Sequence, residues 1–139
     1  MIVLGHVAIS LTGASIIYSY THSLAGFLGF LITGIFVDLD HYIDYIRERG
    51  LSFNLIKICS TFRREYMSFK RLTVFLHSYE LLALLWTAIF IFNLNIVWKS
   101  AAISFTLHLF IDQISNPVAP LAYFLWFRIM NNFETKKFL

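Results

Sequence analysis

Histidine and aspartate side chains recur along this chain at spacings that suit a metal ion. Asp38, Asp40 and His41 fall within four consecutive residues, and His108 and Asp112 are four residues apart. Side chains three or four residues apart project from the same face of a helix. Imidazole and carboxylate together are typical ligands of Zn²⁺, Mn²⁺ or Fe²⁺, whereas a calcium site uses oxygen alone. The pattern therefore predicts a divalent transition-metal site.

The predicted ligands come from four separate apolar segments and lie near an end of each. Zn²⁺ is the preferred ion, with Mn²⁺ or Fe²⁺ as alternatives, and the number of donors allows one ion or two. The predicted ligand set is His6, Asp38, Asp40, His41, His77, His108 and Asp112.

Two carboxylates, Asp40 and Glu80, are the candidate catalytic bases. Asp40 could instead bridge two ions or orient a ligating histidine. Glu80 could instead form a salt bridge with Arg71 or another cation of the neighbouring loop. Asp44 lies beside Arg47 and is expected to pair with it.

The elements that position these residues are predicted to be membrane helices. The chain has 139 residues, 58% hydrophobic and 14% charged, whereas soluble domains carry about 25% charged residues. Residues 1–37 include no Asp, Glu, Lys or Arg, and this run exceeds the roughly 20 residues that cross a bilayer. Because a basic n-region and a cleavage site are missing, we expect a retained helix rather than a signal peptide.

We predict an all-α fold: a single domain, 1–139, forming an integral membrane bundle of four to five transmembrane helices. The last apolar segment is short and contains Pro120, so it could be a re-entrant or tilted helix, and the tail after it is expected to fray. The predicted helices are approximately 2–20, 24–45, 72–92, 96–114 and 118–130.

A basic loop, 47–71, is expected to face the cytoplasm. It carries seven Lys and Arg against two Glu, which orients it inward by the positive-inside rule and does not indicate nucleic-acid binding. We expect an amphipathic helix in the headgroup layer, or else a flexible charged loop. The single cysteine, Cys59, excludes an intrachain disulfide and a multi-thiolate metal site.

This orientation brings the predicted ligands to one depth. With the loop inside, the first and third helices begin at the cytoplasmic face, and the second and fourth end there. His77 is then one turn into its helix, and His22 lies at the opposite interface, outside the group. Ionisable side chains at such depths are usually functional.

Four short motifs resemble the predicted membrane-bound metal-dependent hydrolases of the YdjM type. They are His6, Asp38-Leu-Asp-His41, His77-Ser78 and His108-Leu-Phe-Ile-Asp112, in this order and at matching helix ends. The resemblance implies a metal site made of these residues and phosphoester chemistry distantly similar to zinc-dependent phospholipase C. Val37 stands where the family often has Pro, and Lys70-Arg71 stands where it often has His-Arg, so Glu80 could replace a missing ligand.

These features together predict a metal-dependent hydrolase of the inner membrane, with its site near the cytoplasmic face. Metal-activated water would attack a phosphoester or ester of a phospholipid or lipid-linked substrate. A non-catalytic metal-binding membrane protein and an ion or proton transporter are the alternatives. A homodimer is also possible, but no sequence motif indicates one.

Overall fold

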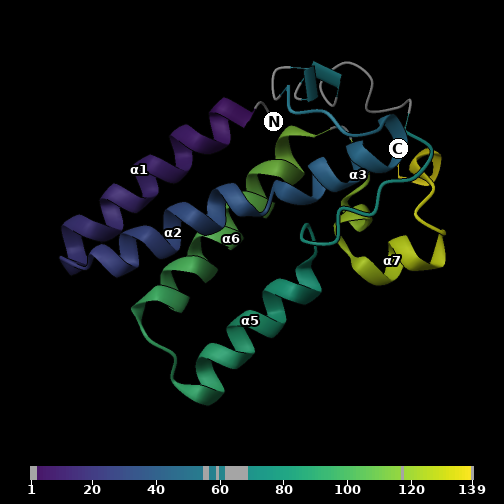
Figure 1. The fold of residues 1–139 in the computed structure, drawn as a ribbon. Helices are drawn as coiled ribbons and strands as arrows, with labels where there is room; N and C mark the ends of the chain where they lie inside the picture. The colour runs from purple at the N-terminus through teal and green to yellow at the C-terminus, as the bar shows by residue number, and fades with distance from the viewer. Residues whose placement is uncertain (1–2, 55–56, 59, 62–68, 117, 139) are drawn as a thin grey trace.

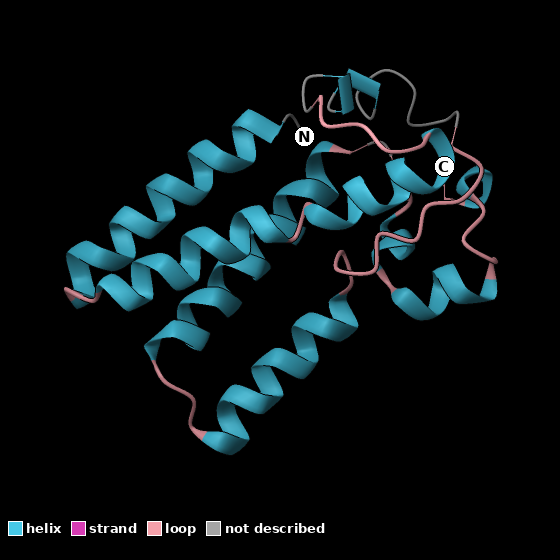
Figure 2. Ribbon diagram, viewed as in Figure 1, coloured by secondary structure: helices cyan, strands magenta, loops and turns pink. Residues whose placement is uncertain are grey.

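The described part of the chain folds into helices joined by turns and irregular segments, as the sequence predicts (Figures 1 and 2). The computed structural model describes residues 3–54, 57–58, 60–61, 69–116 and 118–138. Among these residues the only β-type pairing is an isolated bridge between Arg71 and Glu134. The all-helical fold class is therefore confirmed.

Helix α2 is the centre of the bundle and packs against both α1 and α6 (Figure 1). Ser23 caps α2 by accepting from the Gly26 amide, and Asn95 caps α6 by accepting from the Val97 amide. The main helices are α1 (Val3–Thr21), α2 (Leu24–Phe36), α3 (Leu39–Arg49), α5 (Tyr79–Phe92) and α6 (Ile96–Ser115).

Glycines in α2 allow its two neighbours to approach closely. A Cβ on Gly29 would lie 2.6 Å from the Val97 carbonyl oxygen of α6. A Cβ on Gly34 would lie 2.2 Å from Ser10 Oγ of α1 and 2.9 Å from Ser104 Oγ of α6. Small residues at such contacts are typical of helix packing in membranes.

Three predicted helices have different bounds in the structure. The expected helix 24–45 is divided by a turn at Val37–Asp38 into α2 and α3, and α3 continues to Arg49. The expected helix 72–92 begins only at Tyr79, so 72–78 is irregular and His77 precedes its helix. Ser78 has extended backbone angles at the N-cap position of this helix.

The expected helix 118–130 is two short pieces, η2 (Pro120–Tyr123) and α7 (Leu125–Met130). A helix of 6 residues rises only about 9 Å, which is too short to cross a bilayer. The tail contains η3 (Thr135–Lys137) and does not fray, because Thr135 and Phe138 are buried. Phe138 packs in an apolar cluster with Tyr45, Leu72 and Ala122.

Only part of the basic loop 47–71 can be compared with its prediction, because 55–56, 59 and 62–68 lie outside the described residues. Glu48 accepts from the backbone amides of Lys70 and Arg71, at 3.0 and 2.8 Å. These bonds close the loop at its base, where α3 ends.

One of the described helices, Leu24–Arg49 with its turn included, is long and apolar enough to cross a membrane. Tyr79–Phe92 is apolar but shorter. Length and composition of this kind also occur in signal sequences and in buried helices of soluble proteins. One candidate membrane span is present among the described residues, and the bundle of four to five spans belongs to the proposal below.

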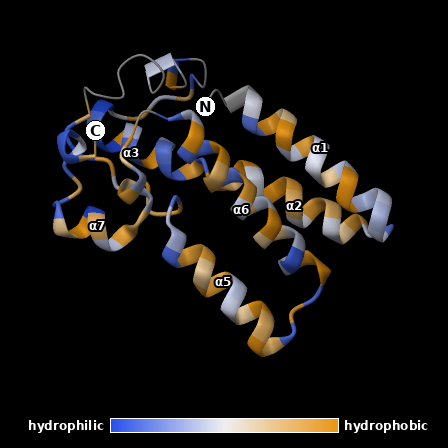
Figure 3. Cartoon of the chain, turned by 180° about the vertical axis from the view of Figure 1, so that it is seen from behind, coloured by the Kyte–Doolittle hydropathy of each residue, from blue (hydrophilic) through white to orange (hydrophobic). Residues whose placement is uncertain are grey.

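The described helices expose large apolar side chains, and their interior contains polar side chains beside its apolar clusters. Figure 3 shows that apolar residues predominate along α1, α2, α5 and α6. Exposed examples include Ile16, Ile32, Leu84, Phe90 and Phe110. The buried polar side chains are His6, Ser10, Asp40, Asp44, His77, Ser78, Ser100, Ser104, His108, Asp112, Arg128 and Thr135.

Candidate metal centre

Four separate parts of the chain bring histidine and aspartate side chains together at one end of the bundle. His6 is in the first turns of α1, Asp38 is at the turn between α2 and α3, and His77 is in segment 72–78. His108 and Asp112 lie on the last turns of α6, four residues apart. The hairpin turns α1–α2 and α5–α6 lie at the opposite end (Figure 1).

Four of these side chains form a compact group, which we call the central tetrahedron: Asp38, His77, His108 and Asp112. Nε2 of His77 lies 3.3 Å from Nε2 of His108. Asp38 Oδ1 lies 3.6 Å from the first of these nitrogens and 3.4 Å from the second. Asp112 Oδ2 lies 3.3 Å from the first and 3.6 Å from the second.

These five distances fall in the range expected between ligands of one tetrahedral ion. Ligand atoms about 2.0–2.2 Å from a tetrahedral zinc ion are about 3.3–3.6 Å from one another. The two histidine nitrogens and two carboxylate oxygens meet this spacing along all five of the edges given above. The residues therefore fit a divalent ion.

The hydrogen bonds of His77 and His108 show which nitrogen of each ring carries the proton. His108 Nδ1 lies 3.1 Å from the Gly34 carbonyl oxygen, which can only accept, so Nδ1 carries the proton. His77 Nδ1 lies 3.1 Å from Asp40 Oδ2, which also accepts from the Leu76 amide. In the neutral form of each ring, Nε2 is then a lone-pair acceptor.

When both rings are neutral, the Nε2 lone pairs of His77 and His108 and the carboxylates of Asp38 and Asp112 therefore face one another. No proton is then available among these four groups to form a hydrogen bond. Such an arrangement needs a cation or additional protons at its centre. Histidines that bind metals almost always donate their other N–H to a carboxylate or backbone carbonyl. His77 and His108 each do so.

His6 and His41 extend the central tetrahedron on opposite sides. His6 Nε2 lies 3.1 Å from Asp112 Oδ1, and its ring stacks on His108 at 4.2 Å between centroids. His41 Nε2 lies 4.0 Å from Asp38 Oδ1. Two overlapping groups could hold an ion: His6, Asp38, His108 and Asp112, and Asp38, His41, His77 and Asp112. Both contain the same two carboxylates, as a pair of ions with shared ligands would require.

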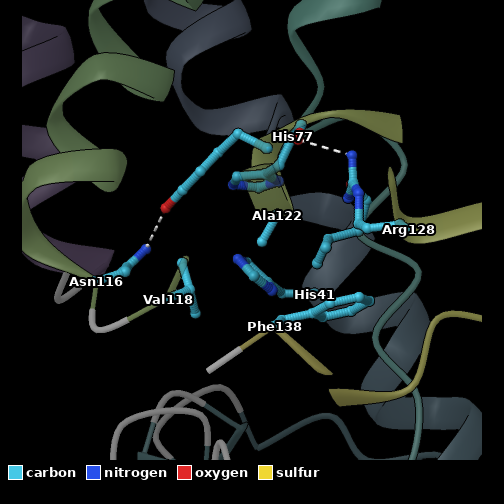
Figure 4. Close-up of a pocket in the computed structure, with 9 residues that line it drawn as sticks. His41, His77, Asn116, Val118, Ala122, Arg128 and Phe138 are labelled. Carbon is cyan, nitrogen blue, oxygen red and sulfur yellow. Dashed lines mark hydrogen bonds between the residues drawn. The ribbon is translucent and has the colours of Figure 1, made fainter. Parts of the chain in front are cut away.

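The cluster is covered on one side and accessible on the other. The side chains of His6, His108 and Asp112 are almost fully buried, whereas those of His41 and Asp38 are 24% and 17% exposed. A small pocket adjoins this accessible side and is lined by His41 and His77 (Figure 4). Its other walls are mainly apolar and include Val118 and Phe138.

Two further aspartates of the acidic motif hold segment 72–78 against α3. Asp40 binds the His77 ring and the Leu76 amide, and neither metal-capable group includes it. Its contacts match the orienting role rather than the ligand role that the sequence also allowed. Asp44 does not pair with Arg47 in the described contacts; it is fully buried and accepts from the amides of Thr73 and Val74.

The structure places Glu80 and His22 away from the cluster. Glu80 accepts from the amides of Leu125 and Trp126, at 2.8 and 3.0 Å, and so caps the first turn of α7. The observed partners of Glu80 are therefore backbone amides, whereas the sequence suggested that it is a catalytic base or a substitute metal ligand. His22 lies in the α1–α2 turn beside Tyr18, at the opposite end of the bundle, as predicted.

One buried charged residue near the site was missed by sequence reasoning. Arg128 is 0% exposed and donates to the carbonyls of Thr73, Val74 and His77. In the sequence, the signal that could have identified Arg128 is its position as the single charged residue of the apolar segment 118–130. Its acceptors belong to a distant segment, so spacing could not identify them.

Comparisons of the chain with protein-family models, curated proteins and solved structures give no match. The chemistry of the site therefore follows from its own geometry. That geometry is a largely buried cluster of histidines and aspartates, accessible from one side, that could hold a metal ion.

Proposed function

We propose that this chain is a membrane-embedded, metal-dependent hydrolase that acts on a phosphoester or ester at the membrane interface. One observation carries the proposal: five distances among the donors of Asp38, His77, His108 and Asp112 fall in the range for ligands of a tetrahedral ion. Zn²⁺ suits two imidazoles and two carboxylates, with Mn²⁺ and Fe²⁺ as alternatives. The resemblance of the motifs to membrane-bound metal-dependent hydrolases agrees with this proposal.

The one-sided accessibility of the cluster favours a catalytic role over a purely structural one. Structural zinc sites are closed by four protein ligands, whereas catalytic sites keep an open position for water or substrate. With Asp38, His77, His108 and Asp112 all bound to one ion, that position would come from expansion to five ligands or from a second ion in the overlapping group that contains His41. Here the accessible side chains are Asp38 and His41, of which His41 lines the pocket, while His6 and Asp112 close the other side. A substrate would therefore approach from the Asp38 side.

A bound divalent ion would lower the pKa of a coordinated water and polarise a phosphoryl or acyl oxygen. The chain's own residues prepare the site for this chemistry. Asp38 and Asp112 supply two negative charges, and Asp40 and the Gly34 carbonyl hold the imidazole protons on Nδ1. His41, whose Nε2 lies 4.0 Å from Asp38 Oδ1, is placed to take up or return a proton at the accessible side.

The distribution of apolar residues supports a membrane location. Large apolar side chains are exposed along the outer faces of the long helices, and the interior holds serines, histidines and aspartates. We propose that α1, α2, α5 and α6 are embedded in the inner membrane, and that α3 and the basic loop lie at its cytoplasmic side. The substrate would then be a phospholipid or a lipid-linked phosphate or ester.

The test is metal content and turnover of the full chain purified in detergent. We expect bound zinc, manganese or iron and hydrolysis of phosphoester or ester lipids in mixed micelles. Asp38→Asn should lose both, and His22→Ala, at the far end, should keep both. A chain without bound metal would contradict the proposal. Metal without turnover would indicate a structural site, and metal-coupled ion flux in liposomes would indicate a transporter.

A further inference from the structure

Segment 72–78 carries a central ligand, His77, without belonging to a helix or a strand. Buried backbone groups outside regular structure need partners elsewhere in the protein. In this segment those partners come from two sides, α3 and α7, which are remote from each other in sequence. The hydrogen bonds from α3 and α7 to this segment therefore determine the position of the His77 ring.

Three N–H groups of the segment are held by α3. Asp44 Oδ2 accepts from the amides of Thr73 and Val74, at 2.8 and 3.0 Å. Asp40 Oδ2 accepts from the Leu76 amide at 2.8 Å. These two carboxylates are one helical turn apart, so the same face of α3 binds three amides of the segment.

The C=O groups of the segment are held by Arg128 of α7. Its Nη1 donates to the Thr73 carbonyl at 2.9 Å and also to the Val74 carbonyl, and its Nη2 donates to the His77 carbonyl at 2.8 Å. Figure 4 shows the bond to His77 beside the pocket. The planar guanidinium presents several donors in a fixed arrangement, which lysine lacks.

The segment also contains a backbone conformation that needs such support. Val74 has φ of +29°, a value that β-branched residues rarely adopt. Strained residues of this kind persist only where the surroundings hold them. Asp44 binds the N–H of Val74 and Arg128 binds its C=O.

We infer that Arg128 is a positioning residue for the metal centre: it fixes segment 72–78 so that His77 Nε2 faces His108, Asp38 and Asp112. The inference rests on the proposed function, because it assigns Arg128 a role in binding the ion. Arg128 does not touch the ion in this scheme; it acts through the backbone of His77.

The test is the affinity for Zn²⁺ of the full chain in detergent, with folding followed by circular dichroism. Arg128→Met keeps most of the side-chain volume and removes every donor. We expect its affinity to fall about 10–100-fold, the range for a lost partner of a metal ligand. Arg128→Lys keeps the charge without the planar donors, so we expect an intermediate affinity.

A matched control separates positioning from general stability. Ile89→Ala removes a buried side chain of α5 about 15 Å along the helix from Tyr79, and should lower the melting temperature without changing zinc affinity. Val74→Gly, combined with Arg128→Met, should restore part of the affinity, since glycine adopts positive φ without steric strain.

Each result decides between the two roles. A folded Arg128→Met chain that binds Zn²⁺ as tightly as Ile89→Ala overturns the inference. If Arg128→Met does not fold, the same comparison is made with Arg128→Lys. A wild-type chain that binds no Zn²⁺ overturns the proposed metal centre as well, and this is seen before any variant is measured.

Discussion

Nε2 of His77 and Nε2 of His108 lie 3.3 Å apart, although one residue precedes α5 and the other is near the end of α6. The other nitrogen of each ring already donates to an acceptor, Asp40 or the Gly34 carbonyl. Neutral rings thus direct two lone pairs at each other. A cation between the two rings would be bound by both Nε2 lone pairs, which would remove their mutual repulsion.

The first prediction concerns the central ligands. His108→Ala removes one donor of the central tetrahedron and should lower zinc affinity by more than the roughly 10–100-fold expected when a hydrogen-bond partner of a ligand is lost. Isothermal titration of the purified chain measures this change. His22→Ala, which alters the α1–α2 turn, is the control. Equal affinities in the two variants would show that His108 is not a ligand.

The second prediction concerns the removal of metal. An ion that binds only the folded chain stabilises it by about 2.7 kcal/mol at a concentration 100 times its Kd. A chelator should therefore lower the melting temperature of the wild-type chain by several degrees. The melting temperature of Asp38→Ala should not respond, because the site is already incomplete. A chelator effect of the same size in both chains would place the ion elsewhere.

The third prediction concerns the contact of α2 with its neighbours. A methyl group at Gly34 would lie 2.2 Å from Ser10 Oγ and 2.9 Å from Ser104 Oγ, so Gly34→Ala should force α1 and α6 away from α2. We expect a loss of about 1–3 kcal/mol in the free energy of unfolding, as for other overpacked sites.

Thermal unfolding in detergent measures this effect. Because Ser10 makes the closer of these contacts, Ser10→Ala combined with Gly34→Ala should recover part of the stability. A Gly34→Ala chain with an unchanged melting temperature would show that the helices pack less closely than described.

The fourth prediction concerns Glu80. Glu80→Ala leaves the amides of Leu125 and Trp126 without their acceptor and should cost about 0.5–2 kcal/mol, as for other lost helix caps. Glu80→Gln retains an acceptor and should cost less. Both variants should still bind zinc at saturation with the wild-type stoichiometry. A lower stoichiometry would restore the role as ligand that the sequence suggested.

The fifth prediction concerns the membrane. The exposed apolar faces of α1, α2, α5 and α6 should keep the chain in the membrane fraction after an alkaline carbonate wash. Release into the soluble fraction would show instead that these faces are covered by protein.

Local spacing in the sequence predicted much of the site. His108 and Asp112 share a helix face because they are four residues apart, and Asp38 follows directly from an apolar helix. These features depend on neighbours along the chain, which a sequence displays. The structure brings His6, Asp38, His41, His77, His108 and Asp112 together as expected.

Long-range contacts explain what the sequence did not predict. The apolar stretch from Leu72 suggested a helix, but its backbone bonds to Asp40, Asp44 and Arg128 instead, so α5 begins at Tyr79. Glu80 carries the charge of a ligand or base, yet its partners are amides 45 and 46 residues away. No periodicity encodes such pairs.

Anomalous diffraction at the zinc edge, from crystals of the wild-type chain, tests the central claim most directly. We predict an anomalous peak within about 2.0–2.2 Å of Nε2 of both His77 and His108, bounded by carboxylate oxygens of Asp38 and Asp112. No peak at this position, or a peak bound by other residues, would contradict the account.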